Sequence, residues 1–185
     1  MPGDRGAAEP ARYALLGLLQ ERPTYGYELT QRFEVGTALG EIVRLAASHL
    51  YALLGKMERD GLIVGKQQDA GARPQRRVYR LTERGREMLL SWLDAPVSHP
   101  RDMRIEFPLK LYMAQLNQPQ RVPALIERQR ATLAAYIERI ERLPAPSASG
   151  IDGSYILLMR EGRVGRARAA LDWLEAGAAV TLTAP

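Results

Sequence analysis

The sequence contains no cysteine and only two histidines, His49 and His99. The absence of cysteine excludes disulfides, cysteine-ligated zinc, iron–sulfur clusters and thiol catalysis, and two histidines are too few for a histidine-rich metal site. No apolar run approaches the ~20 residues that a membrane helix needs, and residues 1–10 lack the apolar core of a signal peptide. We therefore expect a soluble, cytoplasmic protein with no cofactor, no metal and no membrane partner.

The sequence also lacks the common signatures of catalysis. The patterns G-x-S-x-G, G-x-x-x-x-G-K-[ST], H-E-x-x-H and G-x-G-x-x-G do not occur in it, so nucleophile-elbow hydrolases, P-loop NTPases, zincins and dinucleotide-binding enzymes have no support. We expect no enzyme activity and assign no catalytic residue.

The size and charge of the chain suit a small regulatory protein. Its 185 residues allow one compact domain, or a small domain with an appendage. Lysine and arginine number 26 and acidic residues 21, which leaves a net charge of +5. This modest excess, with a pI near 9.7, hints at a polyanionic partner.

Helix and strand signals in the first half follow a recognisable order. Hydrophobic periodicity predicts helices over 11–22, 25–34 and 45–59, strands over 62–64 and 76–81, and a further helix that ends before Pro96. Pro23 ends the first helix, Thr24 is a plausible N-cap of the second, Gly61 ends the third, and Thr82 caps the last. Three helices followed by a hairpin and a helix predict a winged helix-turn-helix, with the hairpin as its wing.

The predicted architecture is therefore mainly α-helical with a small β-hairpin. Residues 1–10 are expected to be a disordered arm. Residues 11–95 are expected to form the winged helix-turn-helix DNA-binding domain. Residues 96–180 are expected to form an all-helical dimerisation domain that could also bind an effector.

The third predicted helix has the pattern of a recognition helix. Steps of about 100° per residue put Leu50, Leu53, Leu54 and Met57 on one face, toward the core. The opposite face and its flanks carry short or polar side chains, among them Ser48, His49, Tyr51, Ala52, Gly55 and Lys56. First-turn N–H groups favour phosphate, and serine and histidine can hydrogen-bond base edges. A plain surface helix remains the alternative reading.

The hairpin favours DNA over that alternative. From Arg73 to Arg86 there are six arginines and one glutamate, which is a local charge of +5. Arg73, Arg76 and Arg77 lie on or near the tip of the wing, and arginine can read minor-groove width. A solvated run of charge is the other interpretation.

An ordered set of short motifs across residues 11–93 resembles the PadR family of transcriptional regulators. The motifs are Ala14-Leu15-Leu16-Gly17-Leu18-Leu19, Tyr25-Gly26-Tyr27-Glu28-Leu29, Leu50-Tyr51 with Leu54 and Met57-Glu58, Asp60-Gly61-Leu62-Ile63, and Val78-Tyr79-x-Leu81-Thr82-x-x-Gly85-Arg86. The resemblance implies that Tyr51 belongs to the DNA-contacting helix and that Tyr25 touches phosphate. The segment before Leu50 departs from the family pattern, so the start of this helix stays open.

The second half resembles, more loosely, the helical region of the longer PadR subgroup. Helices are predicted over 103–115, 119–143 and 153–176, with a break at 144–150. Apolar or large residues recur at heptad spacing from Ile126 to Leu143, which suits a helix that packs against a partner in a dimer. Packing within the chain is the alternative. The arginines at 160, 163, 166 and 168 could pair with Glu138 and Glu141, or be solvated.

The resemblance implies a homodimer that represses nearby genes on double-stranded operator DNA and is released by a small molecule. Trp92 is the first candidate to contact a small aromatic or hydrophobic effector, and Phe107 is a weaker one. Core packing is the alternative for both. A winged helix that binds protein instead of DNA is the alternative function.

Overall fold

The computed structural model describes residues 5–68, 76–147 and 149–181, and the chain divides into two compact units. One unit comprises Met1–Ala95 and Pro108–Gln120, and the other comprises Pro96–Phe107 and Arg121–Pro185. The sequence prediction set a single boundary at residue 96. Residues 108–120 instead group with the first unit, because Met113 packs on α1: a Cβ at Gly17 would lie 2.1 Å from the Met113 sulfur.

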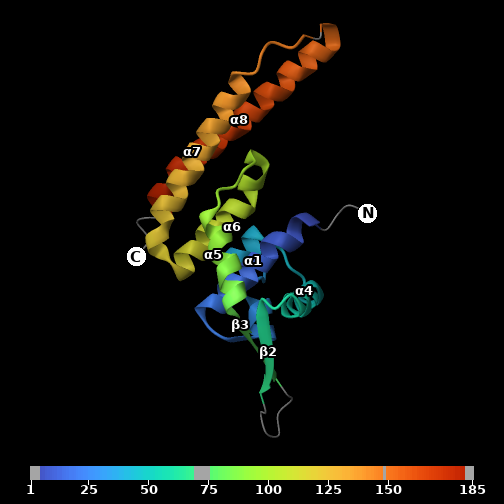
Figure 1. The fold of residues 1–185 in the computed structure, drawn as a ribbon, viewed down its shortest axis with the longest axis vertical. Coiled ribbons are helices and arrows are strands. Elements are labelled where there is room, and N and C mark those ends of the chain that lie inside the picture. The colour runs from blue at the N-terminus through green and yellow to red at the C-terminus, as the bar shows by residue number, and fades with distance from the viewer. Residues whose placement is uncertain (1–4, 69–75, 148, 182–185) are drawn as a thin grey trace. The chain divides into compact units, whose positions relative to one another are not determined.

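The first unit is the predicted winged helix-turn-helix with additional elements (Figure 1). Its elements are α1 (Arg5–Glu21), β1 (Thr24–Tyr25), α2 (Gly26–Gln31), α3 (Ala38–Ile42), α4 (Ala47–Arg59), β2 (Ile63–Gln68), β3 (Arg76–Leu81), α5 (Glu83–Asp94) and most of α6 (Glu106–Asn117). The strands form one antiparallel sheet in the order β1-β3-β2. A mainly helical fold with a small sheet confirms the predicted fold class.

The apolar side of each helix forms the core of this unit. Leu15 of α1, Leu50 and Leu54 of α4, and Leu89 of α5 are at most 1% exposed. Thr82 caps α5 as predicted, since its hydroxyl oxygen accepts from the Gly85 N–H at 3.1 Å. The local sequence signals and the packing therefore agree across the domain.

Three local predictions in this unit are wrong. Helix α1 begins at Arg5, within the arm that was expected to be disordered, because alanine and glutamate in this stretch are strong helix formers. Thr24 does not cap α2: it pairs with Tyr79 in the sheet, and Tyr25 takes the N-cap position. Gly36 and Gly40 predict a loop or short turn between them, but the structure begins α3 at Ala38, and Thr37 caps this helix by accepting from the Gly40 N–H.

The second unit is built on two antiparallel helices that lie side by side (Figure 1). They are α7 (Val122–Glu141) and α8 (Gly150–Thr181). The short helix η1 (Pro100–Arg104) belongs to the same unit, and the short helix η2 (Pro119–Arg121) directly precedes α7 at the boundary between the units. Ile126, Gln129, Leu133 and Ile140 of the predicted heptad seam are buried within the single chain. Most of the seam thus packs inside its own unit, while Tyr136 is half-buried and Leu143 is 40% exposed.

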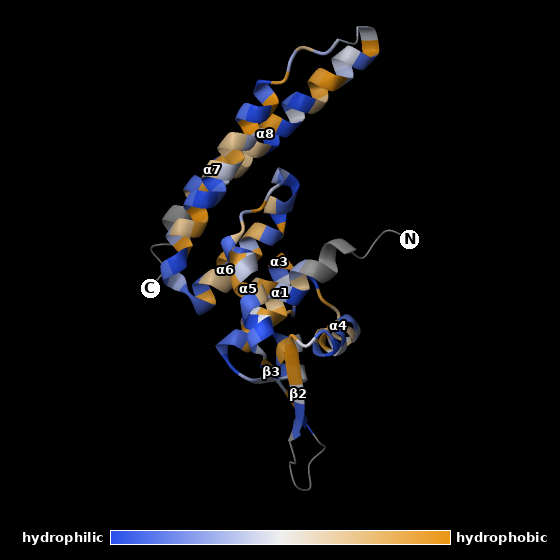
Figure 2. Ribbon diagram, in the orientation of Figure 1, coloured by the Kyte–Doolittle hydropathy of each residue, from blue (hydrophilic) through white to orange (hydrophobic). Residues whose placement is uncertain are grey.

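The exposed apolar surface of this unit lies instead on the first turns of α8. Ile151, Tyr155 and Leu158 are more than half exposed, and Ile156, Leu157 and Met159 are 38–50% exposed. Hydrophobic ribbon marks this end of α8 in Figure 2. Across the described residues, no helix combines the length and the apolar character needed to cross a bilayer.

Candidate nucleic-acid interface

Helix α4 presents the polar face that the sequence predicts. Leu50, Leu54 and Met57 are fully buried, which turns the other side of the helix outward. The outward residues Ser48, His49, Tyr51, Ala52 and Lys56 are all exposed. The helix starts at Ala47, so Ser48 and His49 lie in its first turn.

The N-terminus of α4 is suited to a phosphate group. Its first turn has no acidic residue, and among the described residues no side chain caps it. The amide groups there are left to an external acceptor, and the helix dipole favours an anion at this end.

Tyr51 is held in position by the start of α2. A Cβ at Gly26 would lie 2.7 Å from Cε1 of the Tyr51 ring, so only glycine allows the ring to pack this closely. The ring is nevertheless 48% exposed. Tyr51 is thus anchored on one side and open on the other, as a positioned contact residue requires.

Tyr25 belongs to an aromatic group at the base of the hairpin. Its ring stacks on Tyr27 with 5.7 Å between centroids. The Arg76 guanidinium lies 5.5 Å from the Tyr27 centroid, within the range of a cation–π contact. Tyr27 was not predicted as a site residue, although its aromatic side chain two positions after Tyr25 is a signal that the sequence contains.

Arg77 differs from Arg76 because it is paired to an acid. Its Nη2 donates to both oxygens of Glu58 at 2.7 and 2.8 Å, and Glu58 also accepts from the Gly65 N–H at 2.9 Å. A Cβ at Gly65 would come within 2.4 Å of the Arg77 side chain. Arg77 therefore ties β3 to α4 and β2, and its charge is largely met within the domain.

The third predicted arginine, Arg73, lies outside the described residues. Lys56 is exposed on α4, and Arg76 is exposed at the start of β3. The structure thus joins Tyr25 and Arg76 through Tyr27, places Ser48, His49, Tyr51 and Lys56 on one helix, and gives Arg77 a positioning contact.

The two effector candidates are packed side chains. Trp92 is 8% exposed and stacks face to face on Tyr13 with 4.4 Å between centroids. The Lys110 ammonium lies 4.7 Å from its ring centroid and donates to the backbone oxygens of Trp92 and Ala95 at 2.5 and 2.6 Å. Phe107 is fully buried.

Phe107 lies in the other unit, where its ring meets Trp173 edge to face at 6.0 Å. Trp92 and Phe107 are therefore not brought together within one unit. Among the described residues, no group of acidic or histidine side chains could hold a metal ion.

A helix with an open polar face beside a basic hairpin defines a winged-helix DNA-binding transcription regulator. Residues 15–91 match the model of the transcriptional regulator PadR-like family. The chain is therefore similar to PadR-family transcriptional regulators.

Relatives match over nearly the whole chain. A negative transcriptional regulator, PadR of Bacillus subtilis, is 27% identical over 89% of this chain and 93% of its own. A "probable transcriptional regulator" of Mycobacterium tuberculosis is 24% identical over 88% of this chain and 93% of its own.

Solved structures of Bacillus subtilis PadR are also similar. The complex with operator DNA is 27% identical and covers 92% of this chain and 98% of its own, with a TM-score of 0.46. The complex with p-coumaric acid is 25% identical. The match covers 93% of this chain and 98% of that chain, with a TM-score of 0.43.

Proposed function

We propose that this protein is a homodimeric repressor that binds double-stranded operator DNA through α4 and the wing, residues 62–81. The observation that carries the proposal is the exposed face of α4, with Ser48 and His49 in an uncapped first turn. Such a face can enter a major groove, with first-turn amides on phosphate and side chains on base edges. Repression is supported by the name of the Bacillus subtilis relative.

The wing supplies a second contact beside α4. Arg76 is exposed and backed by Tyr27, so its guanidinium is free on the outer side. Arg77 holds the wing against α4 through Glu58. In this proposal Arg76 and Lys56 contact the DNA backbone, and Arg77 positions the wing.

The dimer is supported by the exposed apolar residues at the start of α8. Contiguous exposed apolar side chains mark interaction surfaces, and a second copy of the chain supplies a self-complementary patch. A Leu158→Glu change in this patch should shift the protein from dimer to monomer in size exclusion with light scattering. A wild-type protein that is monomeric at micromolar concentration would contradict the dimer.

The family resemblance adds a small aromatic or hydrophobic effector that releases the DNA. Because Tyr13 covers Trp92 in the present packing, an effector at Trp92 must displace this ring. Binding there should change the Trp92 fluorescence of a Trp173→Phe protein. We further propose a cytoplasmic location and no catalytic activity.

DNA binding is tested by fluorescence anisotropy with a duplex that the protein enriches from a random pool, against a scrambled duplex, at several salt concentrations. We expect preferential binding with a steep salt dependence. Arg76→Gln should weaken binding and reduce the salt slope by about one. The control is Arg142→Gln, which removes the same charge from the surface of α7.

The same assay distinguishes DNA binding from the alternative function, in which the winged helix binds a protein. If no duplex is enriched, or if operator and scrambled DNA bind equally and Arg76→Gln has no effect, the winged helix binds a protein partner instead. A simultaneous change of Arg76 and Arg77 to glutamate would be less informative. It would replace the Arg77 partner of Glu58 by a second carboxylate and so disturb the wing itself.

A further inference from the structure

A basic pocket lies within the second unit. It has a volume of about 390 Å³ and is formed by η1, α7 and α8. Sites for small molecules typically enclose about 300–1,000 Å³. The pocket does not include Trp92 or Phe107, so it is separate from the two effector candidates.

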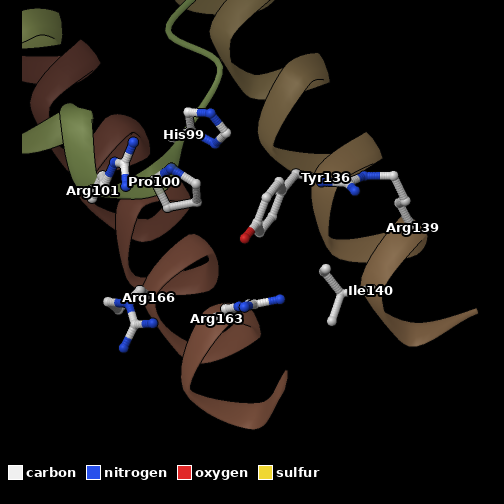
Figure 3. Close-up of a pocket in the computed structure, with 8 residues that line it drawn as sticks. All are labelled: His99, Pro100, Arg101, Tyr136, Arg139, Ile140, Arg163 and Arg166. Atoms are coloured by element: carbon white, nitrogen blue, oxygen red, sulfur yellow. The ribbon is translucent and has the colours of Figure 1, made fainter. Parts of the chain in front are cut away.

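The polar side chains around this pocket are almost all cationic. They are Arg101 and His99 from the η1 segment, Arg139 and Tyr136 from α7, and Arg163 and Arg166 from α8. None of the residues that line the pocket is acidic. In Figure 3 the Tyr136 hydroxyl points into the space that these side chains surround.

Among the residues that the structure describes, three of the four arginines have no acidic partner. Nearby surface arginines do pair: Arg168 binds Glu141 at 2.7 Å, and Arg142 binds Glu138 at 3.1 Å. Within the described residues, Arg139, Arg163 and Arg166 form no such ion pair. Arg101 pairs only loosely, at 3.6 Å, with Asp102. The acids on α7 thus pair outside the pocket. Inside it, Arg139 lies 5.1 Å from the centroid of the Tyr136 ring, a cation–π contact that supplies no negative charge.

Guanidinium groups that line one pocket repel one another, and an anion bound among them relieves this repulsion. Carboxylates and phosphates match the planar fork of arginine and accept two parallel hydrogen bonds from it. Pro100, Ile140 and the Tyr136 ring add apolar walls to the same pocket. The site therefore suits a charged head group attached to a compact apolar body.

We propose that this pocket binds a small organic anion with a carboxylate or phosphate head group. Arg163 and Arg166 hold the head group from α8, and Arg139 holds it from α7. Tyr136 donates its hydroxyl to the anion, and the ring packs against the apolar part. The proposal concerns binding in the second unit, and it stands whether or not the first unit binds DNA.

The test is isothermal titration calorimetry of the full chain with benzoate, with phenyl phosphate, and with benzamide as the neutral isostere of benzoate. We expect saturable binding of at least one anion, with about one site per chain, and no binding of benzamide. The tighter of the two anions identifies the head group. Arg163→Gln and Arg166→Gln should each weaken the anion by at least about tenfold.

The matched control is Arg168→Gln, which makes the same change on α8 outside the pocket and should leave affinity within about twofold. Tyr136→Phe should weaken binding without loss of helix content in circular dichroism. The proposal is overturned if neither anion saturates, if benzamide binds as well as benzoate, or if the control is as damaging as Arg163→Gln.

Discussion

Gln129 offers a direct test of how the linker is held to α7. This side chain is fully buried. Its amide oxygen and its amide nitrogen each form a hydrogen bond with Val97, in the segment between α5 and η1. The Val97 N–H donates to Oε1 at 2.7 Å, and Nε2 donates to the Val97 carbonyl at 3.0 Å. A Gln129→Leu change keeps the approximate size and removes both hydrogen bonds.

The expected loss follows from the two backbone groups left behind. Val97 is 2% exposed, so water does not easily replace the lost partners. Each buried and unsatisfied group costs about 1–3 kcal/mol, and the apolar leucine recovers on the order of 1 kcal/mol. We expect Gln129→Leu to lower the free energy of unfolding by about 1–5 kcal/mol, against the roughly 5–15 kcal/mol of a typical domain.

Urea unfolding followed by circular dichroism measures this loss. Gln115→Leu, on the exposed side of α6, is the control and should stay within about 0.5 kcal/mol of wild type. Gln129→Glu keeps an acceptor for the Val97 N–H but loses the donor, so it should also destabilise. A Gln129→Leu protein as stable as the control would show that these bonds do not hold the linker.

Further predictions concern the first unit. Gly26→Ala should weaken DNA binding in the anisotropy assay by about tenfold with little loss of fold, because a Cβ 2.7 Å from the Tyr51 ring displaces it. Lys110→Met should lower the free energy of unfolding by about 1–3 kcal/mol in urea, since two carbonyl groups at the end of α5 lose their donor. Burial raises the pKa of Tyr79 above 10.0, against the opposing charge of Arg77. The neutral phenol therefore stabilises the fold fully below pH 10, and this contribution falls as the pH rises through the pKa of the folded state; Tyr79→Phe should show a smaller loss of stability above pH 10 than wild type.

The parts of the fold that local sequence determines were predictable. Helical periodicity separated Leu50, Leu54 and Met57, which are buried, from the exposed face of α4. Thr82 was recognised as a cap because its partner, the Gly85 N–H, is only three residues away. In both cases the deciding interaction lies within one or two turns of chain.

Partners that are distant in the sequence were not predictable. Lys110 bonds carbonyl oxygens 15 and 18 residues away, and Gln129 bonds a residue 32 positions away. Neither polarity nor periodicity indicates such a pairing, because a buried lysine and a surface lysine have the same sequence signal. The pairing of Thr24 with Tyr79 was missed for the same reason, since a two-residue strand is defined only by its neighbour.

The heptad seam on α7 shows why periodicity alone does not identify a partner. A stripe from Ile126 to Ile140 is equally suited to a second chain and to a helix of the same chain. The long α8 covers this stripe within the unit. The surface left for a second copy is then the start of α8, where periodicity is weak and side-chain exposure is the informative quantity.

Charge in the hairpin requires the same distinction between a residue type and its partners. The segment Arg73–Arg86 carries six arginines in sequence, but Arg77 is bound by Glu58 and Arg86 lies 3.5 Å from Glu83. A guanidinium that already neutralises a carboxylate releases fewer counterions when DNA binds. The contribution of this segment to the salt slope should therefore be smaller than six arginines would give, and Glu58→Gln should increase the slope if the wing keeps its position. In the proposed complex, Glu58 thus reduces the electrostatic attraction of the wing to DNA and at the same time fixes the position of the wing through Arg77.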